Sequence, residues 1–172
     1  MNTSKSTLRE GVVLGLIGYA TVAAFYAVFD FLAARGSLYT VNLLGLAVFE
    51  GLRDPAVLQL PISLDAVAIG LFNAVHLMVS IAIGVVIAWL VSQIEGGPSH
   101  ARLALFAMAA GFLVTIFGIG MLSEPVRDLL PWWSVVLANV FAVCVGALYV
   151  LRRHPGLFGR IRASLARKVA TA

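Results

Sequence analysis

The sequence contains little charge and almost no cysteine. Lys, Arg, Asp and Glu make up 12% of the 172 residues, whereas a soluble domain has about 25%. The single cysteine, Cys144, excludes an internal disulfide and a Cys-x-x-Cys metal or redox site. Hydrophobic residues make up 61% of the chain, and its mean hydropathy is +1.00, which excludes intrinsic disorder. The composition therefore predicts an all-α membrane protein that forms a single integral domain over residues 1–172.

Signatures of catalysis are also missing from the sequence. It contains no His-Glu-x-x-His motif, no Gly-x-Ser-x-Gly motif and no glycine-rich phosphate loop. His76 and Ser80 are four residues apart in one apolar run, but no oxyanion hole can be identified for a serine hydrolase. We therefore expect that the protein is not an enzyme.

Four long apolar runs predict four transmembrane helices, because a bilayer requires about 20 residues for each span. The runs cover residues 11–34, 65–91, 101–122 and 132–151. Thr7 and Glu10 form a capping-box pattern before the first run, and Ser63 and Ser99 are candidate N-caps of the second and third. The connections between the last three runs are short, which predicts a compact four-helix bundle.

Small residues recur at spacings near four in all four runs. Examples are Gly11 and Gly15 in the first run, Gly84 in the second, Gly118 in the third and Gly146 in the fourth. Small residues in membrane helices mark faces where two backbones approach closely. These faces indicate packing within the bundle, although one of them is equally suited to contact another subunit.

The distribution of basic residues predicts the orientation in the membrane. If the N-terminus is cytoplasmic, nine of the twelve Lys and Arg residues and two of the eight acidic residues lie inside. The net charge is then +7 inside and −3 outside, as the positive-inside rule requires. We expect a multi-pass protein of the inner cell membrane with both termini in the cytoplasm.

Two further segments have the pattern of amphipathic helices. Residues 40–53 place Val41, Leu44 and Val48 on one face and Asn42 and Glu50 on the other, which predicts an interfacial helix on the outer leaflet. This helix is suited either to packing or to a role as a lid or docking surface. In the cytoplasmic tail, residues 152–172, an apolar face is surrounded by basic residues, which predicts a helix on the anionic leaflet. Nucleic acid is not an expected partner, because this charge lies beside the membrane and lacks stacking aromatics.

Polar residues inside the runs are few and share a similar depth. A rise of about 1.5 Å per residue places them in a layer on the outer side of the bilayer centre: His76, Asn73, Asn139, Thr115, Tyr26 and, nearer the surface, Asp30. The layer predicts either an interhelical hydrogen-bond network or an outward-facing pocket in which His76 binds a ligand or relays protons. His100 and His154 lie at the cytoplasmic ends, too far away to complete a bis-histidine haem or a zinc site. We therefore expect no cofactor and no metal.

Three hypotheses for function follow. The preferred one is a non-catalytic subunit or accessory protein of a larger membrane complex, whose partners are the lipid bilayer and either other membrane subunits or further copies of the chain. The second is a small solute transporter or channel that acts as a homo-oligomer with its site around His76. The inner halves of the spans contain almost no polar residue, which disfavours a continuous pore. The third is a haem or quinone carrier that uses His76.

Overall fold

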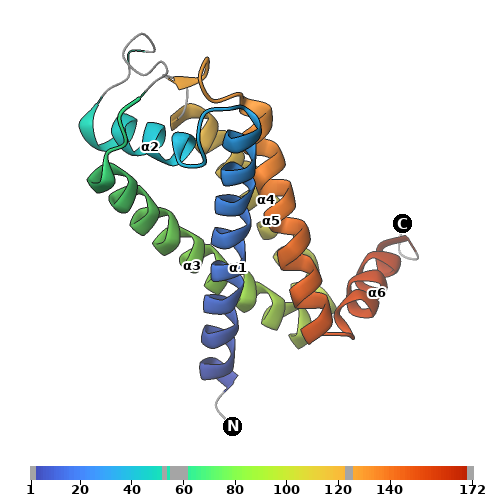
Figure 1. Cartoon of the computed structure of the whole chain (residues 1–172). Helices are drawn as coiled ribbons and strands as arrows, with labels where there is room; N and C mark the ends of the chain where they lie inside the picture. Colours follow the sequence, from blue (N-terminus) through green and yellow to red (C-terminus); the bar gives the residue numbers. More distant parts are fainter. Residues whose placement is uncertain (1–2, 52–53, 55–61, 123–125, 170–172) are drawn as a thin grey trace.

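The computed structural model describes residues 3–51, 54, 62–122 and 126–169, and in these ranges every regular element is a helix (Figure 1). The four long helices are α1 (Thr3–Leu32), α3 (Ala66–Gly96), α4 (Pro98–Leu122) and α5 (Trp132–Arg153). The three short elements are α2 (Tyr39–Gly45), the π-helical turn η1 (Leu46–Glu50) and α6 (Leu157–Val169). The long helices are long and apolar enough to cross a membrane. The predicted all-helical class is confirmed for the described residues, and so is the number of helices long and apolar enough to span a membrane.

Two of the predicted helix starts are wrong. Helix α1 begins at Thr3, so Thr7 lies inside the helix and cannot act as its N-cap. Helix α4 begins at Pro98, before the predicted cap Ser99. Proline suits the first helical position, because its φ is already helical and the amide hydrogen that it lacks has no partner there.

The second span is capped by Asp65 rather than by the predicted Ser63. The Asp65 carboxylate accepts hydrogen bonds from the backbone N–H groups of Val67 and Ala68, both at 2.8 Å. A carboxylate in this position satisfies two of the four unpaired N–H groups at a helix start. Helix α3 also continues to Gly96, beyond the predicted end of this span at residue 91.

Helices α1 and α3 cross where glycines bring their backbones together (Figure 1). A Cβ atom built on Gly84 would collide with the backbone of Gly11 and Gly15, and one built on Gly15 would lie 2.6 Å from the Ser80 carbonyl oxygen. On α5, a Cβ atom at Gly146 would lie 3.2 Å from Cδ1 of Leu14. The glycines of α1 and α3 therefore pack against one another within the chain, and Gly146 of α5 packs against Leu14 of α1.

Two glycines of α4, Gly111 and Gly118, are placed differently. Cβ atoms built on Gly111 and Gly118 would have no described atom within 4 Å. Both glycines are therefore unused in contacts between the described helices. The spacing pattern thus identifies the close contact of α1 with α3, whereas α4 packs through the buried alanines Ala101 and Ala104 near its start.

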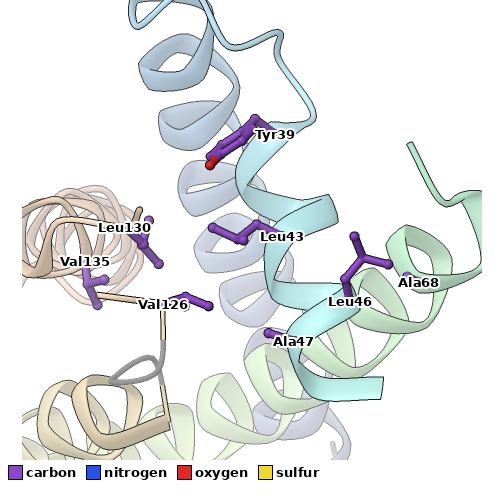
Figure 2. Close-up of a cluster of buried hydrophobic side chains, with 8 residues drawn as sticks. All are labelled: Tyr39, Leu43, Leu46, Ala47, Ala68, Val126, Leu130 and Val135. Atoms are coloured by element: carbon purple, nitrogen blue, oxygen red, sulfur yellow. The ribbon is translucent and has the colours of Figure 1, made fainter. Parts of the chain in front are cut away.

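The buried apolar side chains form two clusters, one at each end of the long helices. The first joins α2 and η1 to the starts of α3 and α5 (Figure 2), and its buried members are Tyr39, Leu43, Leu46, Ala47, Ala68, Val126, Leu130 and Val135. The second joins α1, α3, α4, α5 and α6, and its buried members are Leu14, Leu90, Val91, Ile94, Ala101, Ala104, Val150 and Leu157. The start of α1 and the end of α5 therefore lie at the same end of the molecule, opposite α2 (Figure 1).

The segment predicted to be interfacial is helical from Tyr39 to Glu50, while residues 52 and 53 lie outside the described ranges. Its buried side includes Leu43 and Asn42, with exposed fractions of 0% and 1%, whereas Val48 is 54% exposed. The assignment of Asn42 to an outward polar side is therefore wrong. The Asn42 side chain instead bonds to the backbone before α3, where it accepts from the Asp65 N–H at 2.9 Å and donates to the Ser63 carbonyl at 3.1 Å.

Candidate functional site

His76 lies on α3 beside two aromatic rings. Its ring centroid is 5.2 Å from that of Tyr19 on α1 and 6.1 Å from that of Phe72 on α3. The side chain is half-buried, and its ring forms no hydrogen bond to a described residue. The imidazole therefore retains both of its nitrogens for a group outside the described part of the chain.

Next to His76, Tyr19 and Asn73 form a hydrogen bond between α1 and α3. The Tyr19 hydroxyl donates to Oδ1 of Asn73 at 2.8 Å, while the Asn73 amide donates to the Ile69 carbonyl at 2.9 Å. Tyr19 was not among the predicted site residues. Counting along the first span places Tyr19 on the inner side of the bilayer centre and Tyr26 in the predicted layer, so depth alone did not identify Tyr19.

The other members of the predicted polar layer do not join this pair. The Tyr26 hydroxyl lies 3.4 Å from that of Ser134 on α5, while Asn139 and Thr115 each donate to a carbonyl of their own helix at 2.8 Å. The expectation of one network through the layer is therefore wrong. A backbone carbonyl four residues earlier lies within reach of a helical Thr or Asn side chain and can satisfy its donor without a second helix.

Asp30 belongs to a separate group at the α2 end. Its carboxylate accepts hydrogen bonds from the backbone N–H and the hydroxyl of Thr40, both at 2.7 Å, and the residue is 1% exposed. Nearby, Arg35 donates to the Leu129 carbonyl at 2.9 Å, and its guanidinium lies 5.2 Å from the Tyr39 ring centroid. Burial raises the pKa of Tyr39, although the positive charge of Arg35 acts in the opposite direction. This group anchors α2 against the end of α1.

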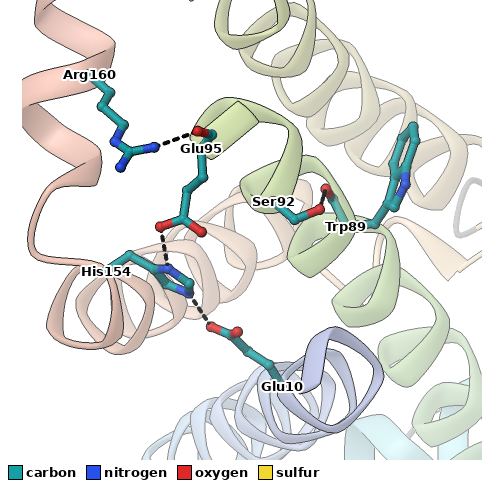
Figure 3. A network of polar contacts seen from close by, with 6 residues as sticks. All are labelled: Glu10, Trp89, Ser92, Glu95, His154 and Arg160. Atoms are coloured by element: carbon teal, nitrogen blue, oxygen red, sulfur yellow. Dashed lines mark hydrogen bonds and ion pairs between the residues drawn. The ribbon is translucent and has the colours of Figure 1, made fainter. Parts of the chain in front are cut away.

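At the opposite end, His154 bridges two helices (Figure 3). Its Nε2 lies 2.7 Å from the Glu10 carboxylate of α1, and its Nδ1 lies 2.9 Å from the Glu95 carboxylate of α3. Arg160 of α6 donates to the backbone carbonyl of Glu95. Burial lowers the pKa of His154, but the hydrogen bonds and negative charges of Glu95 and Glu10 outweigh burial, so the pKa is raised. A protonated ring can donate from both nitrogens at once.

Sequence analysis did not identify this bridge. Its signal was nevertheless available, because Glu10 and Glu95 are the two acidic residues on the predicted inner side and His154 follows the last span. Within the described ranges, no group of three or more His, Cys, Asp or Glu side chains is arranged to hold a metal ion. Every buried polar side-chain atom there has a hydrogen-bond partner. The ionisable groups at both ends therefore act as contacts between helices.

No protein-family model, curated protein or solved structure matches this chain. The class of protein follows from the fold itself, since four of its helices are long and apolar enough to cross a membrane. The chain is a multi-pass membrane protein.

Proposed function

We propose that this protein is a non-catalytic integral subunit or accessory protein of a larger membrane complex. The observation that carries the proposal is the His76 ring, which makes aromatic contacts but no hydrogen bond within the described chain. A polar group inside a membrane span is costly when it lacks a partner. A residue of another subunit that reaches the face of α1 and α3 would supply that partner.

Open glycines in the spans also support a partner subunit. Gly18 of α1, Gly70 of α3, and Gly111 and Gly118 of α4 have no described atom within 4 Å of a built Cβ. Small residues allow close approach of a neighbouring helix in a membrane. These positions would therefore accept helices from a partner while the contact of α1 with α3 holds the subunit together.

The remaining polar groups favour a structural role over transport. Asp30 is bonded to Thr40, Tyr26 lies beside Ser134, and the amide of Asn139 is bonded within its own helix. A transport path needs polar groups that are free to exchange partners along the membrane normal. In the transporter hypothesis, by contrast, the unbonded ring of His76 would bind the solute in a homo-oligomer.

Purification of the full chain in mild detergent tests the proposal. We expect a second polypeptide in fixed ratio to this chain, and we expect His76→Leu to lose it while His76→Gln, which keeps a donor and an acceptor, retains it. The matched control is Asn139→Leu, which removes an intramembrane amide that is bonded to its own helix. The total protein mass of the purified particle then decides. If that mass is accounted for by copies of this chain alone, the subunit hypothesis is contradicted and the transporter hypothesis is favoured.

A further inference from the structure

The end of the molecule at which α5 stops contains arginines without acidic partners. Arg152 and Arg153 are the last residues of α5, and Arg162 lies on α6. All three side chains are exposed, and none forms an ion pair with a described residue. Both acidic residues of this end, Glu10 and Glu95, are bonded to His154 (Figure 3).

Helix α6, which contains Arg162, packs against the membrane spans. Leu157 is buried and Ile161 is half-buried in the cluster formed with α3 and α4, and Arg160 bonds the Glu95 carbonyl at the end of α3. The inner side of α6 is thus occupied by the protein itself. Phe158 and Arg162, which are four residues apart and therefore neighbours on the helix surface, are both exposed, Phe158 by 67%.

We propose that Arg152, Arg153, Arg162 and Phe158 form a surface, the α6 surface, that binds anionic phospholipids. Arg152 and Arg153 are the last residues of the membrane-spanning helix α5 and so lie at the depth of the lipid headgroups. Guanidinium groups bind phosphate oxygens with paired hydrogen bonds. An exposed phenylalanine beside them can insert into the boundary between headgroups and acyl chains. Charge and position together identify the occupant as a lipid.

Lipid binding can be measured on the full chain in dodecyl maltoside micelles. Fluorescent phosphatidylglycerol and phosphatidylcholine are titrated separately, and binding is followed by anisotropy. We expect saturable binding of phosphatidylglycerol that weakens at high salt, together with much weaker binding of phosphatidylcholine. Each arginine removed should weaken the affinity about fivefold, so the triple variant R152Q/R153Q/R162Q should lose roughly 100-fold.

Two further variants keep the test decisive. Arg162→Gln alone leaves the arginines that flank the last span in place, so its expected loss of about fivefold is measurable even if the triple variant does not fold. Arg127→Gln is the matched control, since Arg127 is exposed at the opposite end of the molecule. This variant should bind phosphatidylglycerol with the affinity of the wild type.

Several outcomes would overturn the proposal. They are equal affinity for the two lipids, unchanged phosphatidylglycerol binding by Arg162→Gln in the folded protein, and an equal loss in the Arg127→Gln control. Displacement of phosphatidylglycerol by inorganic phosphate at matched ionic strength would likewise show a general anion site. The test is independent of the proposed subunit role, because it uses the purified chain and adds no second polypeptide.

Discussion

At the scale of single residues, His154 at one end of the helices and Asp30 at the other each bond to a partner in a different segment. His154 joins the carboxylates of Glu10 and Glu95, which come from α1 and α3. Asp30 joins α1 to Thr40 of α2. Charged pairs that are fully exposed contribute little to stability, but His154 and Glu10 have side chains that are only 18% and 12% exposed. These contacts therefore help to fix which helix ends lie together.

The His154 bridge predicts a pH-dependent stability. The pKa of His154 is raised in the folded state, so folding favours the protonated ring. Its contribution is fully present below the pKa of the unfolded chain and is lost as pH rises through the higher folded-state pKa. We expect the melting temperature in detergent to fall as the pH is raised from about 6 to about 8.5, the range in which histidine side chains lose their proton. His154→Gln should remove much of this dependence, and an unchanged pH profile in that variant would contradict the prediction.

His76 should behave differently from its neighbour Tyr19 when the chain is isolated. The His76 ring has no hydrogen bond to lose within the described chain, so His76→Leu should leave the melting temperature nearly unchanged. Tyr19→Phe removes the hydroxyl that donates to Asn73 at 2.8 Å, and interhelical bonds in membranes contribute on average about 0.6 kcal/mol. Thermal melts of the two variants in one detergent make the comparison. A large loss from His76→Leu would indicate that the chain itself supplies a partner for the ring.

At the scale of helices, the crossing of α1 and α3 depends on the absence of a side chain. A Cβ atom at Gly84 would overlap the backbone of Gly11 and Gly15, whereas one at Gly70 of the same helix has open space. Overpacking of a close contact typically costs about 1–3 kcal/mol. We therefore expect Gly84→Leu to destabilise the folded chain by about that amount. The matched control Gly70→Leu should have little effect on the melt of the purified chain, and equal effects of the two substitutions would show that α1 and α3 do not meet there.

The sequence predicts the helices far better than it predicts their polar contacts. Apolar runs define four spans because the thickness of the bilayer core sets the length of a transmembrane helix. Glycine spacing identifies Gly84 as a packing position. Depth along a span can be counted from the sequence, but the direction of each side chain around the helix axis depends on which neighbours are present. For that reason Tyr26 and His76, predicted to share a layer, contact Ser134 and Tyr19 respectively. The hydrogen bonds of Asn42 could not be predicted from the sequence either, because their partners are backbone groups more than 20 residues away along the chain.

At the scale of the whole molecule, the structure and the charge pattern together predict how the chain sits in the membrane. The start of α1 and the ends of α3 and α5 meet at His154. The chain therefore starts and ends its spans on the same side of the membrane, as an even number of spans requires. In the charge count from the sequence, the other six acidic residues fall on the opposite side. From the positive-inside rule we therefore expect the His154 end to face the cytoplasm.

Cysteine accessibility tests this orientation. In a Cys144→Ala background, single cysteines are placed at Ser37, in the turn between α1 and α2, and at Ser6 and Ala163 near the His154 end; all three residues are exposed. An impermeant maleimide added to intact cells should label the cysteine at position 37 and should label those at positions 6 and 163 only after the membrane is opened. Labelling after the membrane is opened shows that positions 6 and 163 can react, so their failure to react in intact cells reports the membrane barrier rather than burial. Labelling at position 6 or 163 from outside, with position 37 protected, would reverse the assignment and place the α6 surface on the outer leaflet.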